Sequence, residues 1–134
     1  MPRIIEKELS YKLVGILFDV HTRLGNRYQE KYYQRAVAEA LKENNLKFEK
    51  ELEVDLKYKD AKIGKYFSDF LIEKKVILEI KAVPCLLPRD FHQVLAYLKA
   101  RKLELGILAN FRSASLAYER ILNSDLKTRI DTNS

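Results

Sequence analysis

The sequence has almost none of the residues that form disulfides or structural metal sites, which stabilise many small proteins. One residue in 134 is cysteine, so no internal disulfide can form, and the single cysteine and two histidines do not make a zinc cluster. Only four glycines and three prolines occur, and no Pro/Gly-rich linker, internal repeat or low-complexity segment divides the chain. The chain must therefore fold by burying apolar side chains.

Long apolar runs are also missing. No segment approaches the ~20 apolar residues of a membrane span, and the first twelve residues carry charges where a signal peptide needs an apolar core. A lone thiol, Cys85, suits a reducing compartment, and neither His21 nor His92 is identifiable as the base that a catalytic cysteine would need. We therefore expect a cytoplasmic protein without membrane contact, in which Cys85 is structural.

Hydrophobic and charged residues are both plentiful. Hydrophobic residues make up 47% of the chain and charged residues 33%, which is typical of a globular protein. A chain of 134 residues fits one domain, here residues 1–134, with enough length for a real core. The formal charge of +6 is compatible with a polyanionic partner, but the cations are spread along the chain and are equally compatible with solubility.

Apolar spacing predicts eight elements. Helices are expected over residues 10–24, 29–43, 89–101 and 115–123, strands over 48–58, 66–72, 76–83 and 106–111, and a frayed tail over about 125–134. This order predicts an α/β sandwich with a mixed sheet of about four strands.

The hairpin over residues 66–83 carries charges inside its hydrophobic strands. If Ile72 and Val76 close it, the antiparallel register sets Asp69 directly across from Glu79, and alternation places Lys81 on the same side as Glu79. Two opposed carboxylates destabilise a sheet unless a cation lies between them, and carboxylate oxygens suit Mg²⁺ or Mn²⁺.

A solvated strand face is the alternative for these charges. Apolar neighbours on the same face favour a site instead: Ile77 and Val83 accompany Glu79 and Lys81, and Phe67 and Leu71 flank Asp69.

Four further polar residues each have an ordinary alternative. Glu30 begins a helix, where an acidic side chain is favourable in any case. Gln93 and Tyr97 lie one turn apart on one helix flank, where boundary residues are common. His21 lies on an amphipathic helix, where a histidine is more often packed or capping than catalytic.

Several motifs in order resemble a known family. Asp69 followed by Glu79-x-Lys81 resembles the signature of the PD-(D/E)XK nuclease superfamily, and Gln93-x-x-x-Tyr97 resembles the motif of its exonuclease-like branch. More narrowly, the chain resembles the small GxxExxY family in the segments Val20-His21 with Leu24-Gly25, Glu30-x-x-Tyr33, and Gly106 to Phe111. Arg27 stands where the namesake motif has its first glycine.

The resemblance implies a restriction-endonuclease-like fold with core order αβββαβ, and phosphodiester hydrolysis. Asp69 and Glu79 would hold Mg²⁺ (or Mn²⁺), with the Ile80 carbonyl as a further ligand. Lys81 would orient or deprotonate the attacking water or offset charge in the transition state. Glu30 would bind a metal-bound water or act as a further ligand.

Gln93 and Tyr97 would then position the site or contact nucleic acid, and the basic surplus would serve phosphate binding. Three functions stay open: a metal-dependent nuclease acting on nucleic acid, DNA in the first place; a nucleic-acid-binding module with little or no activity; and a structural or interaction subunit. A homodimer would let a chain with one site cut both strands.

Overall fold

The computed structural model describes residues 5–124 and has three helices and five strands. In chain order these are α1 (Lys7–Leu24), α2 (Glu30–Glu43), β1 (Phe48–Tyr58), β2 (Ala61–Ile72), β3 (Val76–Lys81), α3 (Pro88–Arg101), β4 (Leu105–Asn110) and β5 (Ala117–Leu122). The predicted tail over 125–134 lies outside the described residues. In the described part of the chain, no helix has the length and apolar character that crossing a bilayer requires.

The strands form one mixed sheet in the order β1-β2-β3-β4-β5. β3 and β4 run parallel and are joined through α3, and the other neighbouring pairs are antiparallel. β2 pairs with β3 through Phe70–Leu78, Leu71–Ile77 and Ile72–Val76, so the register predicted for the hairpin is confirmed. The α/β sandwich with a mixed sheet is confirmed as well.

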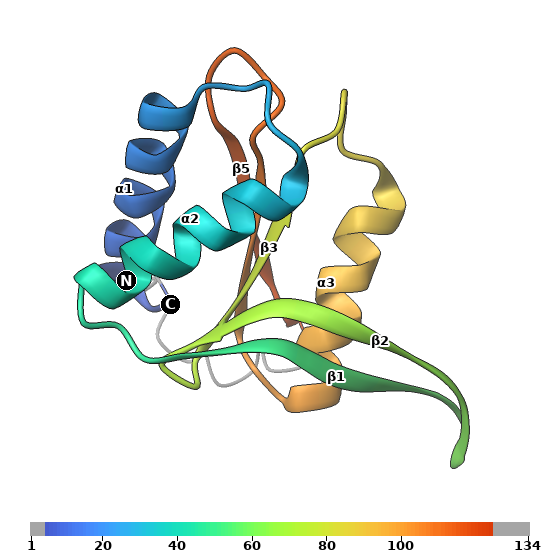
Figure 1. Cartoon of the computed structure of the whole chain (residues 1–134). Helices are drawn as coiled ribbons and strands as arrows, with labels where there is room; N and C mark the ends of the chain where they lie inside the picture. Colours follow the sequence, from blue (N-terminus) through green and yellow to red (C-terminus); the bar gives the residue numbers. More distant parts are fainter. Residues whose placement is uncertain (1–4, 125–134) are drawn as a thin grey trace.

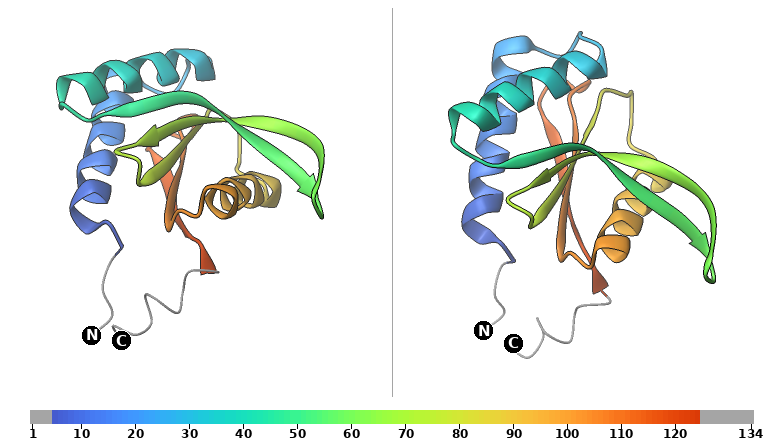
Figure 2. Two further views of the ribbon diagram at one scale, coloured as in Figure 1. Left: turned by 90° about the horizontal axis from the view of Figure 1, so that it is seen from below. Right: turned by 60° about the horizontal axis from the view of Figure 1, so that its bottom comes forward.

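Helices cover both faces of the sheet (Figures 1 and 2). α1 and α2 pack on one face over Phe70, Leu78 and Ile80, and α3 packs on the other face over Ile77 and Leu108, so each face has its own apolar core. α3 lies so close to β4 that a Cβ at Gly106 would approach Val94 Cγ1 to 2.5 Å. Only glycine allows this distance, which fixes α3 beside the site.

The predicted helix over 115–123 is wrong, because this segment contains the strand β5. β4 is fully buried, and one of its two backbone edges is already bonded to β3. The open edge would leave buried N–H and C=O groups unpaired, which costs more than the weak helix preference of the segment can recover. β5 satisfies that edge in antiparallel register from Leu105–Leu122 to Asn110–Ala117.

β1 and β2 continue together well past the end of β3. Their ladder runs from Phe48–Ile72 to Tyr58–Ala61, and the two strands form a curved ribbon that packs on α3 and projects past it at its far end (Figures 1 and 2). A left-handed residue, Glu51 (φ 51°), and a register shift at Leu56/Lys57 accompany the bend. β2 therefore separates from β3 in the middle of the sheet, next to Asp69.

Candidate active site

Asp69 and Glu79 meet at the point where β2 separates from β3. The Asp69 backbone N–H donates to Glu79 Oε1 (2.8 Å), and the Ile80 backbone N–H donates to Asp69 Oδ2 (2.7 Å). Each carboxylate thus accepts a bond from the opposite strand where the backbone ladder stops. We call this arrangement of Asp69, Glu79 and Ile80 the acidic split; the side chains replace ladder bonds that would otherwise be lost.

Tyr97 stabilises the separated strand from the α3 side. Its hydroxyl donates to the carbonyl of Phe67 (2.7 Å), two residues before Asp69, and its ring meets Tyr66 edge to face at 4.7 Å. Tyr97 is fully buried, whereas Phe67, expected among the apolar neighbours of Asp69, is 53% exposed. Burial and the nearby charges of Glu79 and Asp69 raise the pKa of Tyr97, which keeps the phenol protonated as a donor.

The acidic split is electrostatically unfavourable as it stands. Burial, with the charge of Asp69 as the second cause, raises the pKa of Glu79 from 4.5 to about 8, and this side chain is only 4% exposed. Burial also raises the pKa of Asp69 from 3.8 to about 6, against the bond from the Ile80 N–H, which lowers it. Carboxylates whose pKa is strongly raised by burial and by a nearby like charge are concentrated at functional sites.

Lys81 follows Glu79 by two residues and supplies a cation. Its charge lowers the pKa of both Asp69 and Glu79, but its amine lies 3.8 Å from Asp90 Oδ1. Asp90 is anchored in the first turn of α3, where its other oxygen accepts the N–H of Leu87 (2.8 Å). Lys81 is therefore held between the acidic split and the start of α3.

Glu30 and Gln34 approach from α2. Gln34 Nε2 donates to Asp69 Oδ1 (3.1 Å) and to Glu30 Oε2 (3.3 Å), so one amide links the two carboxylates. The charge of Glu30 contributes to the raised pKa of Asp69 and of Glu79, so Glu30 is close enough to interact electrostatically with both carboxylates. Its position as the first residue of α2 is as predicted within one residue.

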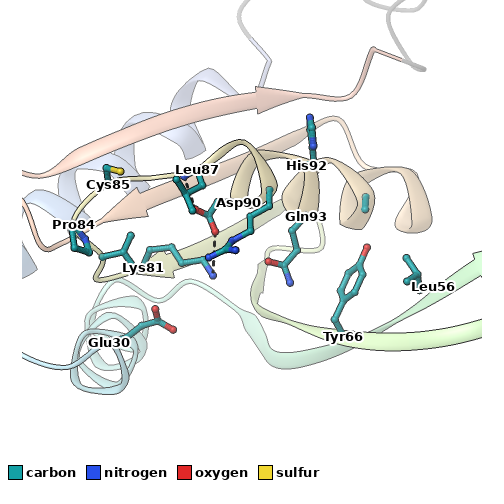
Figure 3. Close-up of a pocket in the computed structure, with 13 residues that line it drawn as sticks. Glu30, Leu56, Tyr66, Lys81, Pro84, Cys85, Leu87, Asp90, His92 and Gln93 are labelled. Atoms are coloured by element: carbon teal, nitrogen blue, oxygen red, sulfur yellow. Dashed lines mark hydrogen bonds and ion pairs between the residues drawn. The ribbon is translucent and has the colours of Figure 1, made fainter.

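A cleft of about 820 Å³ opens beside Lys81 (Figure 3). Glu30 from α2 and Gln93 from α3 line it together with Lys81 and Asp90. Tyr97 is fully buried and is not among the lining residues. The cleft thus gathers Glu30, Lys81 and Gln93 from three elements that are distant in sequence.

The carboxylates fit a hard divalent cation. Within residues 5–124, no three His, Cys, Asp or Glu side chains group as a preformed cage. The protein ligands would be Asp69 and Glu79, and Mg²⁺ typically takes one or two carboxylates and keeps several waters. Each carboxylate oxygen that accepts a bond has a second lone pair, and a cation would offset the burial and the neighbouring negative charges that raise both pKa values.

His21 lies in a different cluster. Its Nε2 is 3.0 Å from the carbonyl of Ser113, it is 8% exposed, and its ring lies against Phe111. Tyr33 stacks on the same Phe111 (ring centroids 4.6 Å apart) and donates its hydroxyl to the carbonyl of Gly25 (2.7 Å). We call His21, Tyr33 and Phe111 the latch, because their contacts join the end of α1 and the start of α2 to the segment after β4.

Arg27 belongs to the loop between α1 and α2 and is exposed. Gly25 ends α1 with a positive φ of 79° and returns its N–H to the His21 carbonyl. Asn26 then donates to the carbonyl of Arg112 (2.9 Å). The glycine missing at position 27 is therefore not needed to end the helix.

Sequence reasoning missed Gln34 and Asp90. Gln34 lies four residues after Glu30, which puts both on one helix face, and this spacing was the available signal. Asp90 lies in the first turn of a predicted helix, where an acidic residue is common, and no spacing in the sequence links it to Lys81.

Three comparisons place the chain among known proteins. A solved structure titled "Crystal structure of SSO0001" superposes with a TM-score of 0.53 at 21% identity, over 78% of this chain and 56% of that one. The chain thus spans little more than half the length of that protein, and the likeness concerns the fold alone. No curated protein matches the sequence significantly. The family model of the PD-(D/E)XK nuclease superfamily matches residues 7–123. The chain therefore belongs to the PD-(D/E)XK nuclease superfamily.

Proposed function

We propose that the protein is a metal-dependent nuclease that hydrolyses phosphodiester bonds of DNA, within the narrower GxxExxY family. One observation carries this proposal: a half-buried carboxylate, Asp69, and a buried one on the neighbouring strand, Glu79, share a site with the amine of Lys81, and both have raised pKa values. Superfamily membership supports nuclease chemistry in general.

In this proposal, Asp69 and Glu79 hold Mg²⁺ or Mn²⁺, and the Ile80 carbonyl is a further ligand. The ion would polarise the phosphate and lower the pKa of a bound water. Bond donation from the Ile80 and Asp69 N–H groups orients one oxygen of each carboxylate. Gln34 keeps Asp69 and Glu30 in place from α2.

Lys81 orients the attacking water or offsets charge that develops on the phosphate. To do so, its amine leaves Asp90, and the spacing of 3.8 Å makes that contact weak. Glu30 binds a water at the metal, Gln93 contacts the substrate across the cleft, and Tyr97 positions β2 through the Phe67 carbonyl.

The test is cleavage of single-stranded, duplex and branched DNA by the purified protein with Mg²⁺ or Mn²⁺. Replacing Lys81 by Ala, or Glu79 by Gln, is expected to lower the rate about 100- to 1000-fold, as the loss of one group that stabilises the transition state does. Arg101→Ala, at the far end of α3, is the control. Cleavage that is absent in the wild type, or equal in Lys81→Ala, would contradict the proposal.

A nucleic-acid-binding module of the same fold is the second candidate. The formal charge of +6 supports it independently of the acidic split. Salt-dependent binding of DNA without turnover would favour this candidate. The homodimer stays a prediction, to be checked by the mass of the protein in solution.

A further inference from the structure

The start of α2 and the loop before it carry a cluster of aromatic and basic side chains that the acidic split does not use. Tyr28 and Tyr32 meet edge to face with centroids 6.2 Å apart, and they are 49% and 43% exposed. The Lys31 amine and the Arg35 guanidinium both lie over the Tyr32 ring, at 5.3 and 5.6 Å from its centroid. We call these four residues the aromatic platform.

Tyr28 and Tyr32 stay exposed although the adjacent Tyr33 is fully buried. Two exposed aromatic rings in contact are typical of a binding surface. The two rings add little to the core, because each keeps almost half of its surface exposed to solvent. Lys31 and Arg35 have no carboxylate within ion-pair distance among the described residues. Their charge is therefore available to an anion.

The aromatic platform connects directly to the site. Lys31 and Arg35 line a hollow of about 180 Å³ that also contains Lys50, Gln34 and Asp69. This hollow reaches Asp69 from the α2 side, whereas the large cleft with Lys81 lies toward α3. Glu51 lines it as well, so cations and carboxylates are mixed there. A phosphate held by Lys31 and Arg35 would thus be next to the acidic split.

Resting on the proposed nuclease function, we propose that the aromatic platform binds the unpaired bases of a single-stranded segment on one side of the cut phosphate. Bases stack on Tyr28 and Tyr32, and the phosphates between them contact Lys31 and Arg35. Every base has a stacking face, so this binding is tolerant of sequence. Bases inside a duplex are stacked on their neighbours and cannot present their faces, so the platform selects an unpaired over a paired segment.

The test measures binding of a fluorescent 12-nucleotide single strand and of the matching duplex, in Ca²⁺ or EDTA so that no cleavage occurs. Tyr28→Ala with Tyr32→Ala is expected to raise the Kd for the single strand at least about tenfold, because stacking on one aromatic residue alone is worth about five- to 100-fold. The Kd for the duplex should change less than about twofold. Tyr11→Ala, which removes a tyrosine that is 84% exposed on α1, is the matched control.

A second pair of variants separates phosphate contacts from net charge. Lys31→Ala with Arg35→Ala should make the slope of log K against log salt shallower by about 1.4 for the single strand, since each lost contact contributes about 0.7. Lys7→Ala with Lys12→Ala, on α1, removes the same charge and should leave the slope nearly unchanged.

Equal loss of duplex and single-strand binding in the tyrosine variant, or no loss relative to Tyr11→Ala, would overturn the platform. Cleavage by the wild type keeps the two proposals apart. A wild type that cleaves while the tyrosine variant binds normally refutes the platform alone. Selective binding through the platform by a protein that does not cleave refutes the nuclease alone.

Discussion

Tyr33 and Gln34 are neighbours in α2, yet they belong to two different regions. In one the polar groups are neutral and paired, and in the other carboxylates of like charge lie close together. Tyr33 belongs to the latch, where its hydroxyl has both an acceptor and a donor and its ring is stacked on Phe111. Gln34 belongs to the acidic split, where it donates to carboxylates that repel each other. Both regions contain buried polar groups, but only the second places like charges close together, which opposes stability. Residues whose polar groups are all paired hold the fold, whereas carboxylates that repel each other point to a candidate site.

The largest loss in the free energy of unfolding is expected from a substitution in the latch. Phe111→Ala should lower the free energy of unfolding by about 3–5 kcal/mol, because a fully buried ring that packs on Tyr33 and His21 is lost. Urea denaturation measures this loss. Phe18→Ala, at a ring that is 42% exposed, should cost less than half as much. Activity per folded molecule should be retained, and its selective loss would show that the latch is part of the site.

The acidic split should instead make stability depend on pH. The pKa of Glu79 rises from 4.5 to about 8 on folding, so between these values the folded state holds a proton that the unfolded chain has lost. The free energy of unfolding should therefore fall as pH rises from 5 to 8, by about 2–4 kcal/mol without divalent ions. Asp69 adds to the fall in the lower part of this window, up to about pH 6.

Glu79→Gln keeps an acceptor for the Asp69 N–H and removes the charge. This variant should melt at a higher temperature than the wild type at pH 8 and should lose most of the pH dependence. Glu39→Gln, at an exposed residue of α2, is the control and should keep the wild-type slope. A wild type that becomes more stable from pH 5 to pH 8 would contradict the assignment of the raised pKa values.

A smaller effect is expected from His21→Ala. The loss of its contact with the Ser113 carbonyl and of packing against Phe111 should cost about 1–2 kcal/mol. Thermal unfolding measures the cost, and cleavage assays well below the melting temperature should show an unchanged rate. A rate that falls without a change in melting would move His21 from the latch to the site.

Gln34→Ala should give the smallest effect, a rate lowered about three- to tenfold, or about 1 kcal/mol. The amide lowers the pKa of Asp69, so its loss should shift the acid limb of the pH–rate profile to higher pH. Gln29→Ala, just before α2, should leave both quantities unchanged. An unshifted profile would show that Gln34 only packs beside Asp69.

Local patterns predicted most of the fold correctly. α1, α2, α3 and β4 begin and end within three residues of their predicted bounds. β5 could not be predicted from its own residues, because the free edge of β4 decides its conformation. That edge exists only after β3, α3 and β4 have assembled.

The acidic pair was also predictable, since a hairpin register fixes which residues meet. What the sequence did not reveal is how they meet: the carboxylates bond to the opposite backbone, and Tyr97 holds the Phe67 carbonyl where the ladder ends. Contacts between distant elements, such as Gln34 with Asp69 and Lys81 with Asp90, depend on how α2 and α3 pack on the sheet.

The three-residue turn over 73–75 sets which residues of β2 and β3 face each other. Glu73 and Lys74 both adopt left-handed backbone angles there, and Glu73 is tied to the start of β1 through its N–H and its carboxylate, both bonded to Lys47. Asp69 and Glu79 are thus aligned by residue count within one hairpin. An insertion here that slipped the register by one residue would turn one carboxylate to the other side of the sheet, so the length of this turn matters for the pairing as much as the identity of the two acidic residues.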